Sequence, residues 1–178
     1  MREYVTDAVV LGMRPVREND RTVALFTKDL GKIEVKVVAA RKLVSKFSPH
    51  LDPLNLVHVR LVKKNNFTLT DVLTKNRFSR LRGRAAVLGR SLELISLLNN
   101  LLPLSVPEPR VWHSLIHAFE GKGVKVKLFL QLLGYDPLHA SCANCHAQRV
   151  EAFSRFEQSF FCGKCARTFP SSELILLD

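Results

Sequence analysis

Two Cys-x-x-Cys pairs near the C-terminal end constrain this chain more than any other feature of its sequence. The first pair is Cys142 and Cys145, and the second is Cys162 and Cys165. Sixteen residues separate the pairs, a spacing typical of zinc ribbons, and the chain has no further cysteine. Two residues between thiolates let one tight turn present both sulfurs to the same tetrahedral ion. The spacing therefore predicts one structural Zn²⁺ bound by these four cysteines.

Other uses of four cysteines have less support. Two disulfides would suit a secreted chain, but no signal peptide is recognisable after Met1. A redox dithiol needs only one pair, and nothing specifically indicates an iron–sulfur cluster. His146 could replace one thiolate, although four sulfurs already fill the shell. A filled shell leaves no position for a reacting water, so the metal is expected to hold the fold rather than to catalyse.

Positive charge is concentrated in the first half of the 178-residue chain, whose formal net charge is +11. Residues 1–82 contain 17 Lys and Arg against 8 Asp and Glu, whereas residues 83–178 contain 10 against 8. An excess of positive charge in one segment is typical of a protein that binds a polyanion. A basic surface kept for solubility would give the same excess of Lys and Arg. The most apolar run, Ala85–Leu102, is interrupted by polar and charged residues, so no membrane span is expected.

Five short apolar segments predict a small closed β-barrel over residues 1–80. The expected strands are Tyr4–Met13, Arg21–Thr27, Lys32–Val37, Pro53–Lys63 and Phe67–Leu73. Closure would remove the unpaired sheet edges, and the five-stranded OB-fold is the expected form. An SH3-like barrel would satisfy the same pattern. The overall class is therefore α+β, with an N-terminal barrel, a small helical domain and a four-cysteine zinc ribbon or knuckle.

Residues 81–139 form the expected helical domain, because apolar residues recur there every three or four positions. Helices are predicted over Ala85–Leu102, from Pro109 to about Phe119, and over Val124–Leu133. Pro103, the Gly121–Gly123 segment and Gly134 would end them. Trp112 is expected in the core.

Residues 140–178 form the expected zinc module and a short tail. The segment between the cysteine pairs, Ala152–Phe161, is predicted to fold as a hairpin. Four phenylalanines are expected to shield the metal sulfurs: Phe153, Phe156, Phe160 and Phe161. Pro170–Glu173 has the composition of a helix start.

Eight basic side chains are predicted to contact the polyanion, and they lie in or beside the expected strands: Lys32, Lys36, Arg41, Lys42, Lys46, Arg60, Lys63 and Lys64. Ammonium and guanidinium contacts to phosphate position a strand but carry no base code, so binding should be independent of sequence. Base stacking would need exposed aromatic rings, for which Phe47 and Phe67 are the candidates.

No motif predicts an enzyme. The chain has neither a Walker-type phosphate loop nor a His-Glu-x-x-His motif. His113 and His117 lie four residues apart and could bind a metal, but without a third ligand ordinary packing is expected. The main alternative to DNA binding is a zinc-ribbon module that binds RNA or a ribosomal surface. A metal-dependent nuclease is a weaker alternative.

Several short motifs resemble the RecO family of bacterial recombination mediators. In the first two expected hairpins these are Glu18–Arg21 and Leu25–Lys32. Further along the chain they are Ala39–Lys42, Ser45–Phe47, Leu51–Leu54, and Leu132–Tyr135 leading into Cys142. They follow the family's order of basic barrel, helices and cysteine pairs, and the resemblance spans most of the chain.

The resemblance implies a DNA repair and recombination protein of the RecFOR pathway. Such proteins bind single- and double-stranded DNA through the OB-fold, anneal complementary strands, and assist RecA loading together with RecR and the single-strand-binding protein. They are not enzymes, they take no small-molecule substrate, and they act in the bacterial cytoplasm in association with the nucleoid. Family members usually continue into further helices after the second cysteine pair, whereas this sequence ends at Asp178.

Overall fold

A computed structural model describes residues 1–15, 21–37 and 46–177, and divides the chain into two compact units, Met1–Lys122 and Gly123–Asp178. The helices expected at 81–139 are divided between these units. The three functional parts expected from the sequence, a barrel at 1–80, a helical domain at 81–139 and a zinc module at 140–178, therefore stay a prediction.

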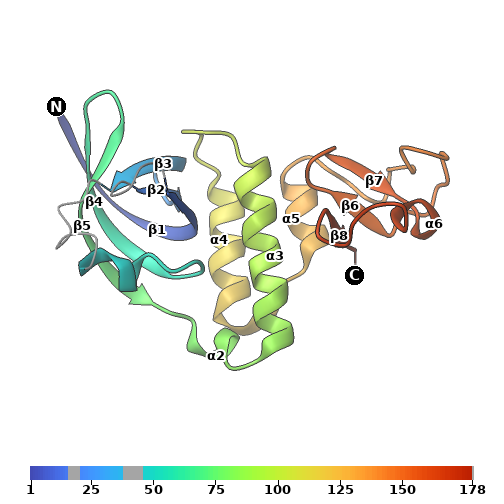
Figure 1. The fold of residues 1–178 in the computed structure, drawn as a ribbon, viewed down its shortest axis with the longest axis horizontal. Helices are drawn as coiled ribbons and strands as arrows, with labels where there is room; N and C mark the ends of the chain where they lie inside the picture. The colour runs from blue at the N-terminus through green and yellow to red at the C-terminus, as the bar shows by residue number, and fades with distance from the viewer. Residues whose placement is uncertain (16–20, 38–45, 178) are drawn as a thin grey trace. The chain divides into compact units, whose positions relative to one another are not determined.

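The first unit contains a five-stranded sheet whose strands follow the predicted segments (Figure 1). Its strands are β1 (Arg2–Pro15), β2 (Arg21–Thr27), β3 (Gly31–Val37), β4 (Leu56–Lys63) and β5 (Phe67–Asn76). The hydrogen-bonded order is β1-β2-β3-β5-β4, and β1 also pairs with β4. These pairs are antiparallel except for β3 with β5, which run parallel.

The alternation read in the sequence matches the observed burial. Ile33, Val35 and Val37 on β3 are buried, while Glu34 and Lys36 between them are exposed. On β4 the same period buries Val57, Val59 and Leu61 and exposes His58 and Arg60. Since successive side chains of a strand point to opposite faces, these apolar residues form one shared core.

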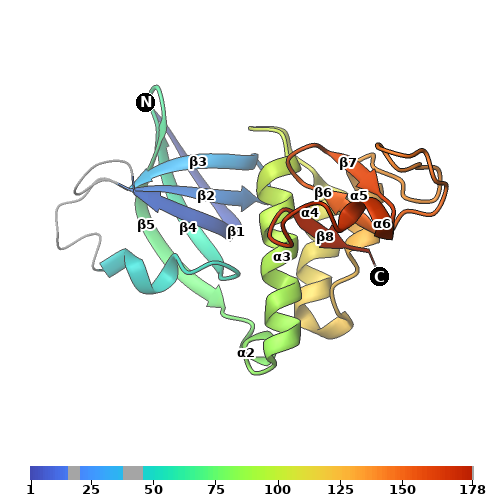
Figure 2. The same cartoon turned by 45° about the vertical axis from the view of Figure 1, so that its right-hand side comes forward.

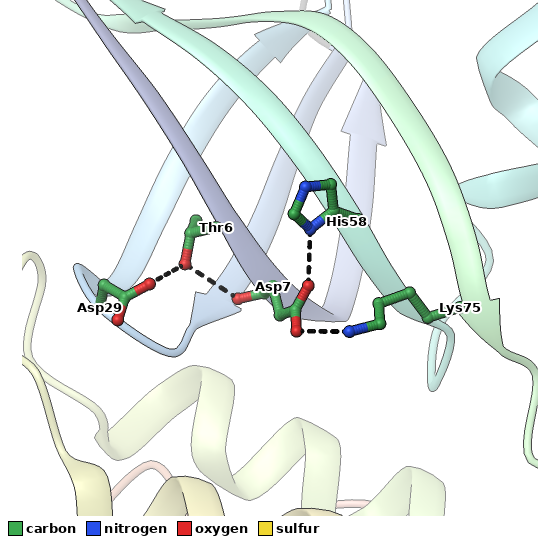
Figure 3. A network of polar contacts seen from close by, with 5 residues as sticks. All are labelled: Thr6, Asp7, Asp29, His58 and Lys75. Atoms are coloured by element: carbon green, nitrogen blue, oxygen red, sulfur yellow. Dashed lines mark hydrogen bonds and ion pairs between the residues drawn. The ribbon is translucent and has the colours of Figure 1, made fainter.

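A polar network on β1 links this strand to three other parts of the sheet (Figure 3). The Asp7 carboxylate accepts hydrogen bonds from His58 Nδ1 at 2.7 Å and from Lys75 Nζ at 2.8 Å. The buried Thr6 hydroxyl donates to Asp29, in the turn between β2 and β3, at 2.6 Å. Burial alone would raise the pKa of Asp7, but the bonds from Lys75 and His58 lower this pKa below its usual value of 3.8.

Helices continue the first unit after the sheet. They are the short α2 (Ser79–Arg82), α3 (Ala85–Leu101) and α4 (Pro109–His117), which the π-type turn η2 (Ala118–Lys122) follows. A 3-10 turn, η1 (Ser48–His50), precedes β4. Trp112 is buried as expected and packs edge-on against Phe26 of β2, with ring centroids 5.7 Å apart.

The segment between α3 and α4 lies against the start of β3. Ser105 donates its backbone N–H to the Lys32 carbonyl at 2.7 Å, and Leu104 forms an isolated parallel bridge with Lys32. Gly31 has φ +70°, and a Cβ at this position would overlap the Val106 carbonyl. A glycine is therefore required here both by the backbone conformation and by the close approach.

The second unit contains α5 (Val126–Leu132), a three-stranded sheet and the short helix α6 (Gly163–Ala166). The predicted hairpin is confirmed as β6 (Ala152–Ser154) and β7 (Ser159–Phe161), seen from a second angle in Figure 2. The expected helix start at Pro170 is wrong. The chain forms β8 (Leu174–Leu176) instead, which pairs with the other edge of β6 and buries Ile175. Within the described ranges, no helix has the length and apolarity needed to cross a bilayer.

Candidate metal centre and nucleic-acid interface

Two tight turns position the four cysteines in the second unit. In the first turn, His146 donates its backbone N–H to the Cys142 carbonyl and Cys142 donates to the Ala147 carbonyl, both at 2.9 Å. In the second turn, Cys162 caps the N-terminus of α6, and its sulfur accepts the Cys165 backbone N–H at 3.5 Å. Each Cys-x-x-Cys pair therefore presents both of its sulfurs from one turn.

The four sulfurs converge as a single metal site requires. The Sγ atoms of Cys142, Cys145, Cys162 and Cys165 all lie within 4.8 Å of one another, and those of Cys145 and Cys162 are 3.6 Å apart. With Zn–S bonds of about 2.3 Å, sulfurs at tetrahedral corners lie about 3.8 Å apart. The donor set and its spacing therefore fit Zn²⁺. Cys142 and Cys165 are buried and Cys145 is exposed, so the cluster opens to solvent on one side.

Hydrogen bonding lowers the pKa of one buried thiol, whereas the proximity of other sulfurs raises the pKa of another. Burial alone would raise the pKa of Cys142, but backbone N–H groups of Cys162, Cys145 and Asn144 lower this pKa to about 6. For Cys165, the Asn144 amide favours the thiolate, but the neighbouring sulfurs and burial outweigh it and raise the pKa to about 12. Repulsion between neighbouring thiolates thus disfavours deprotonation of the last thiol. A bound divalent cation would offset this repulsion.

The aromatic surroundings of the sulfurs differ in part from the prediction. Phe161 packs with the buried cysteines as expected, but its partner is Phe169, with ring centroids 4.6 Å apart. Phe153 and Phe160 are buried against each other, whereas Phe156 is 66% exposed. Phe169 follows the second cysteine pair, so an argument confined to the residues between the pairs could not identify it.

His146 is exposed and has a positive φ of 59° at the end of the first turn. In the described parts of the chain, the only group of three or more candidate ligand atoms close enough to share an ion consists of the four cysteine sulfurs. The expectation that the imidazole stands outside the ligand set agrees with this geometry.

Four exposed cations gather at one end of the five-stranded sheet. We call Arg2, Lys36, Lys63 and Lys64 the basic end. Arg2 lies opposite Lys63 in the β1–β4 register, and Lys36 lies opposite Thr68, next to Phe67, which pairs with Lys63. Both overall views show the turn between β4 and β5 next to the N-terminus (Figures 1 and 2).

Two of these cations, Arg2 and Lys63, contact aromatic rings rather than carboxylates. The Arg2 guanidinium lies 5.2 Å from the Tyr4 ring centroid, and Lys63 Nζ lies 4.8 Å from the Phe67 centroid. The Tyr4 and Phe67 rings meet edge to face at 5.7 Å. A ring positions a cation without neutralising it. Like charges on opposed strand positions cost stability, so this gathering favours a role in binding an anion.

The eight predicted contact residues fall into distinct environments. Lys36, Lys46, Lys63 and Lys64 are exposed, with no acidic partner among residues 1–15, 21–37 and 46–177. Arg60 pairs with Glu3 at 3.2 Å. Lys32 is half-buried and donates to the Asn99 carbonyl of α3 at 2.8 Å, while burial lowers its pKa. Arg41 and Lys42 lie outside the described residues.

Stacking on the two candidate rings is not available in this arrangement. Phe47 is 4% exposed and Phe67 is 8% exposed, and both belong to the sheet core. Neither candidate ring is therefore available for base stacking, because both side chains fill the interior of the sheet. Arg2 was missed by the sequence analysis. Its register opposite Lys63 depends on the β1–β4 pairing, which no local pattern reveals.

Comparisons with known proteins identify relatives that cover most of the chain. A family model described as "Recombination protein O N terminal" matches residues 1–78. The DNA repair protein RecO of Geobacter metallireducens is 26% identical over 183 residues, covering 94% of this chain and 74% of that protein. Its counterpart from Geobacter sulfurreducens is 30% identical over 152 residues, covering 78% of this chain and 62% of that protein. Over most of its length the chain is similar to proteins of the RecO family.

The RecO family match coincides with the part of the chain that contains the basic end. Residues 1–78 include the whole five-stranded sheet, from Arg2 to Asn76. A third relative, the DNA repair protein RecO of Thermodesulfovibrio yellowstonii, is 24% identical over 187 residues. That alignment covers 97% of this chain, including the cysteine pairs, and 74% of the relative. The chain thus spans between 62% and 74% of these three RecO relatives.

Proposed function

We propose that this chain acts in DNA repair and homologous recombination as a mediator that binds single- and double-stranded DNA and anneals complementary strands. Similarity to the RecO family supports the role in repair, since the relatives are named DNA repair proteins. We further propose that it assists RecA loading together with RecR, and that the single-strand-binding protein is a partner. These partners follow from the family resemblance.

The basic end is the observation that carries the DNA-binding part of this proposal. Its four cations are exposed, with no carboxylate partner in the described parts of the chain. Arg2 and Lys63 are opposed on the paired strands β1 and β4, Lys64 follows Lys63, and Lys36 lies on β3, on the other side of β5. Neighbouring strands lie about 4.8 Å apart, so the opposed Arg2 and Lys63 are close enough together to contact successive phosphates of one DNA strand. We propose that Lys46, Arg41 and Lys42 add further phosphate contacts, as their place in the sequence after β3 suggests.

Annealing follows from charge neutralisation. Two complementary strands repel each other through their phosphates, and cations that bind phosphate lower this repulsion. Because such contacts carry no base code, the bases stay free to pair. The proposed mechanism needs neither a nucleotide nor a catalytic divalent ion.

Two finer assignments of the fold belong to the same proposal. We propose that the five-stranded sheet is an OB-fold barrel, which is supported by the pairing of β1 with both β2 and β4. We also propose that the second unit is a zinc ribbon with one Zn²⁺ bound by Cys142, Cys145, Cys162 and Cys165. The ion would supply four covalent-like links between two turns and no open coordination position.

A fluorescence-quench annealing assay with the zinc-loaded chain tests the proposal. We expect acceleration of annealing that is independent of ATP, and a marked loss of this acceleration in the double variant Lys63→Ala, Lys64→Ala. The matched control is Lys125→Ala, Lys127→Ala, which removes the same charge from exposed positions of the second unit and should retain annealing. If annealing is no faster than in buffer while structured RNA binds tightly, the chain is an RNA-binding module instead.

A further inference from the structure

Helix α4 presents two histidines to solvent on one face. Val111, Trp112 and Leu115 form the buried side of this helix, whereas His113 and His117 are exposed. Residues four apart on a helix lie on the same side, with Cβ atoms about 5–6 Å apart. This spacing allows two imidazoles to bind one ion.

A backbone contact prepares one of these imidazoles as a metal ligand. His113 Nδ1 lies 2.7 Å from the carbonyl oxygen of Pro109. A carbonyl can only accept, so Nδ1 must carry the proton and Nε2 is left with its lone pair. Metal-binding histidines usually donate their second ring nitrogen to a carbonyl or carboxylate in this way, which fixes both tautomer and ring orientation.

The remaining surroundings suit a hydrated cation. Glu120 lies three residues after His117, and its exposed carboxylate adds negative charge beyond the end of α4. The two histidines, Glu120 and Trp112 border an open hollow of about 450 Å³, which leaves room for water ligands. Imidazole nitrogen suits Zn²⁺, Ni²⁺ and Cu²⁺, whereas Mg²⁺ and Ca²⁺ prefer oxygen donors.

We propose that His113 and His117 form a second metal site, which binds a borderline divalent cation such as Zn²⁺ or Ni²⁺ through two imidazoles and completes the shell with water. Glu120 strengthens the site through its charge. The residues of this site belong to the first compact unit, whereas the four cysteines belong to the second. Unlike the cysteine cluster, it has open coordination positions, so it exchanges its ion readily.

The test uses the full chain with the cysteine site already loaded with zinc, and Ni²⁺ as the probe. Trp112 is the chain's only tryptophan and borders the hollow, so bound Ni²⁺ should quench its fluorescence. We expect uptake of one equivalent of Ni²⁺ with quenching, and a loss of affinity of about 10-fold or more in His113→Gln and in His117→Gln. His139→Gln is the matched control, since His139 is exposed in the second unit and bonds to Asp136.

Both substituted histidines are exposed, so the variants should fold, and circular dichroism of the helices checks this directly. Uptake and quenching that are unchanged in both His113→Gln and His117→Gln would overturn the proposal. Absence of Ni²⁺ uptake by the zinc-loaded wild-type chain would overturn it equally. Neither result bears on DNA annealing, which depends on other residues.

Discussion

The sulfurs of Cys145 and Cys162 lie 3.6 Å apart, although the two residues are 17 positions apart and belong to different pairs. Each pair sits in its own turn, and the β6–β7 hairpin between them brings the turns together. An ion shared by the four sulfurs would therefore link the two ends of this hairpin.

Replacing one metal ligand should remove both the ion and the fold of the second unit. In Cys162→Ser we expect loss of bound zinc and unfolding of this unit, since zinc contributes about 10–16 kcal/mol of apparent binding free energy in small modules. Elemental analysis and limited proteolysis are the measurements. Ser141→Ala, an exposed change beside Cys142, is the control. Stoichiometric zinc in the purified Cys162→Ser variant would contradict the assignment.

Two arginines of β1 should differ in their effect on DNA affinity. Arg2 has no acidic partner among the described residues, whereas Arg14 forms a two-point ion pair with Glu34 at 2.8 Å. In Arg2→Ala, the slope of log K against log salt on single-stranded DNA should become shallower by about 0.7, the value for one lost phosphate contact. Arg14→Ala should leave the slope unchanged. If both changes altered the slope equally, this result would show that the DNA does not bind specifically at the basic end.

Two glycines of the first unit should respond differently to an added methyl group. In Gly31→Ala, the Cβ would meet the Val106 carbonyl at a positive φ, and we expect a loss of about 2–4 kcal/mol in the free energy of unfolding. Gly12→Ala is the control, because nothing lies within 4 Å of its Cβ position. Urea unfolding measures the free energy of unfolding of both variants. Equal values would show that the Val106 carbonyl does not exclude a Cβ at position 31.

The Asp7 network should make stability depend on acid pH. The pKa of Asp7 is lowered in the folded state, so its contribution is present above the ordinary pKa of 3.8 and is lost as pH falls through the folded-state value. Asp7→Asn should cost about 1–2 kcal/mol near neutral pH, through the weakened bonds to His58 and Lys75.

The two proteins should then converge in stability at low pH, where the Asp7 carboxyl is protonated in both the folded and the unfolded state. Urea unfolding of both at several pH values is the measurement, with Asp52→Asn as an exposed aspartate control. A difference between wild type and Asp7→Asn that persists unchanged in strong acid would contradict the electrostatic explanation.

Local patterns predicted the elements well. Arg21–Thr27 was predicted with the bounds that β2 has, and the helix expected at Ala85–Leu102 differs from α3 by one residue. These segments succeed because a period of two or of 3.6 residues is a property of the segment itself. The closeness of the two sulfurs within each Cys-x-x-Cys pair could be predicted for the same reason, since a turn needs only its own four residues.

Features that depend on distant pairing could not be predicted in this way. Leu174–Leu176 is a strand because β6 offers it an edge, and no local signal distinguishes it from the start of a helix. Phe67 looked available for stacking but is covered by Tyr4 and Lys63, which arrive from other strands. Arg2 and Lys63 likewise become neighbours only through the β1–β4 register.

The same β1–β4 register has a consequence for synthesis on the ribosome. β2 follows β1 closely and can form a hairpin with it early, but His58, the partner of Asp7 on β4, lies 51 positions later. Until β4 has left the exit tunnel, the other edge of β1 exposes unpaired backbone groups next to apolar side chains, and such an edge is a template for aggregation. The emerging chain therefore depends on prompt translation of β4, or on a chaperone that covers this edge.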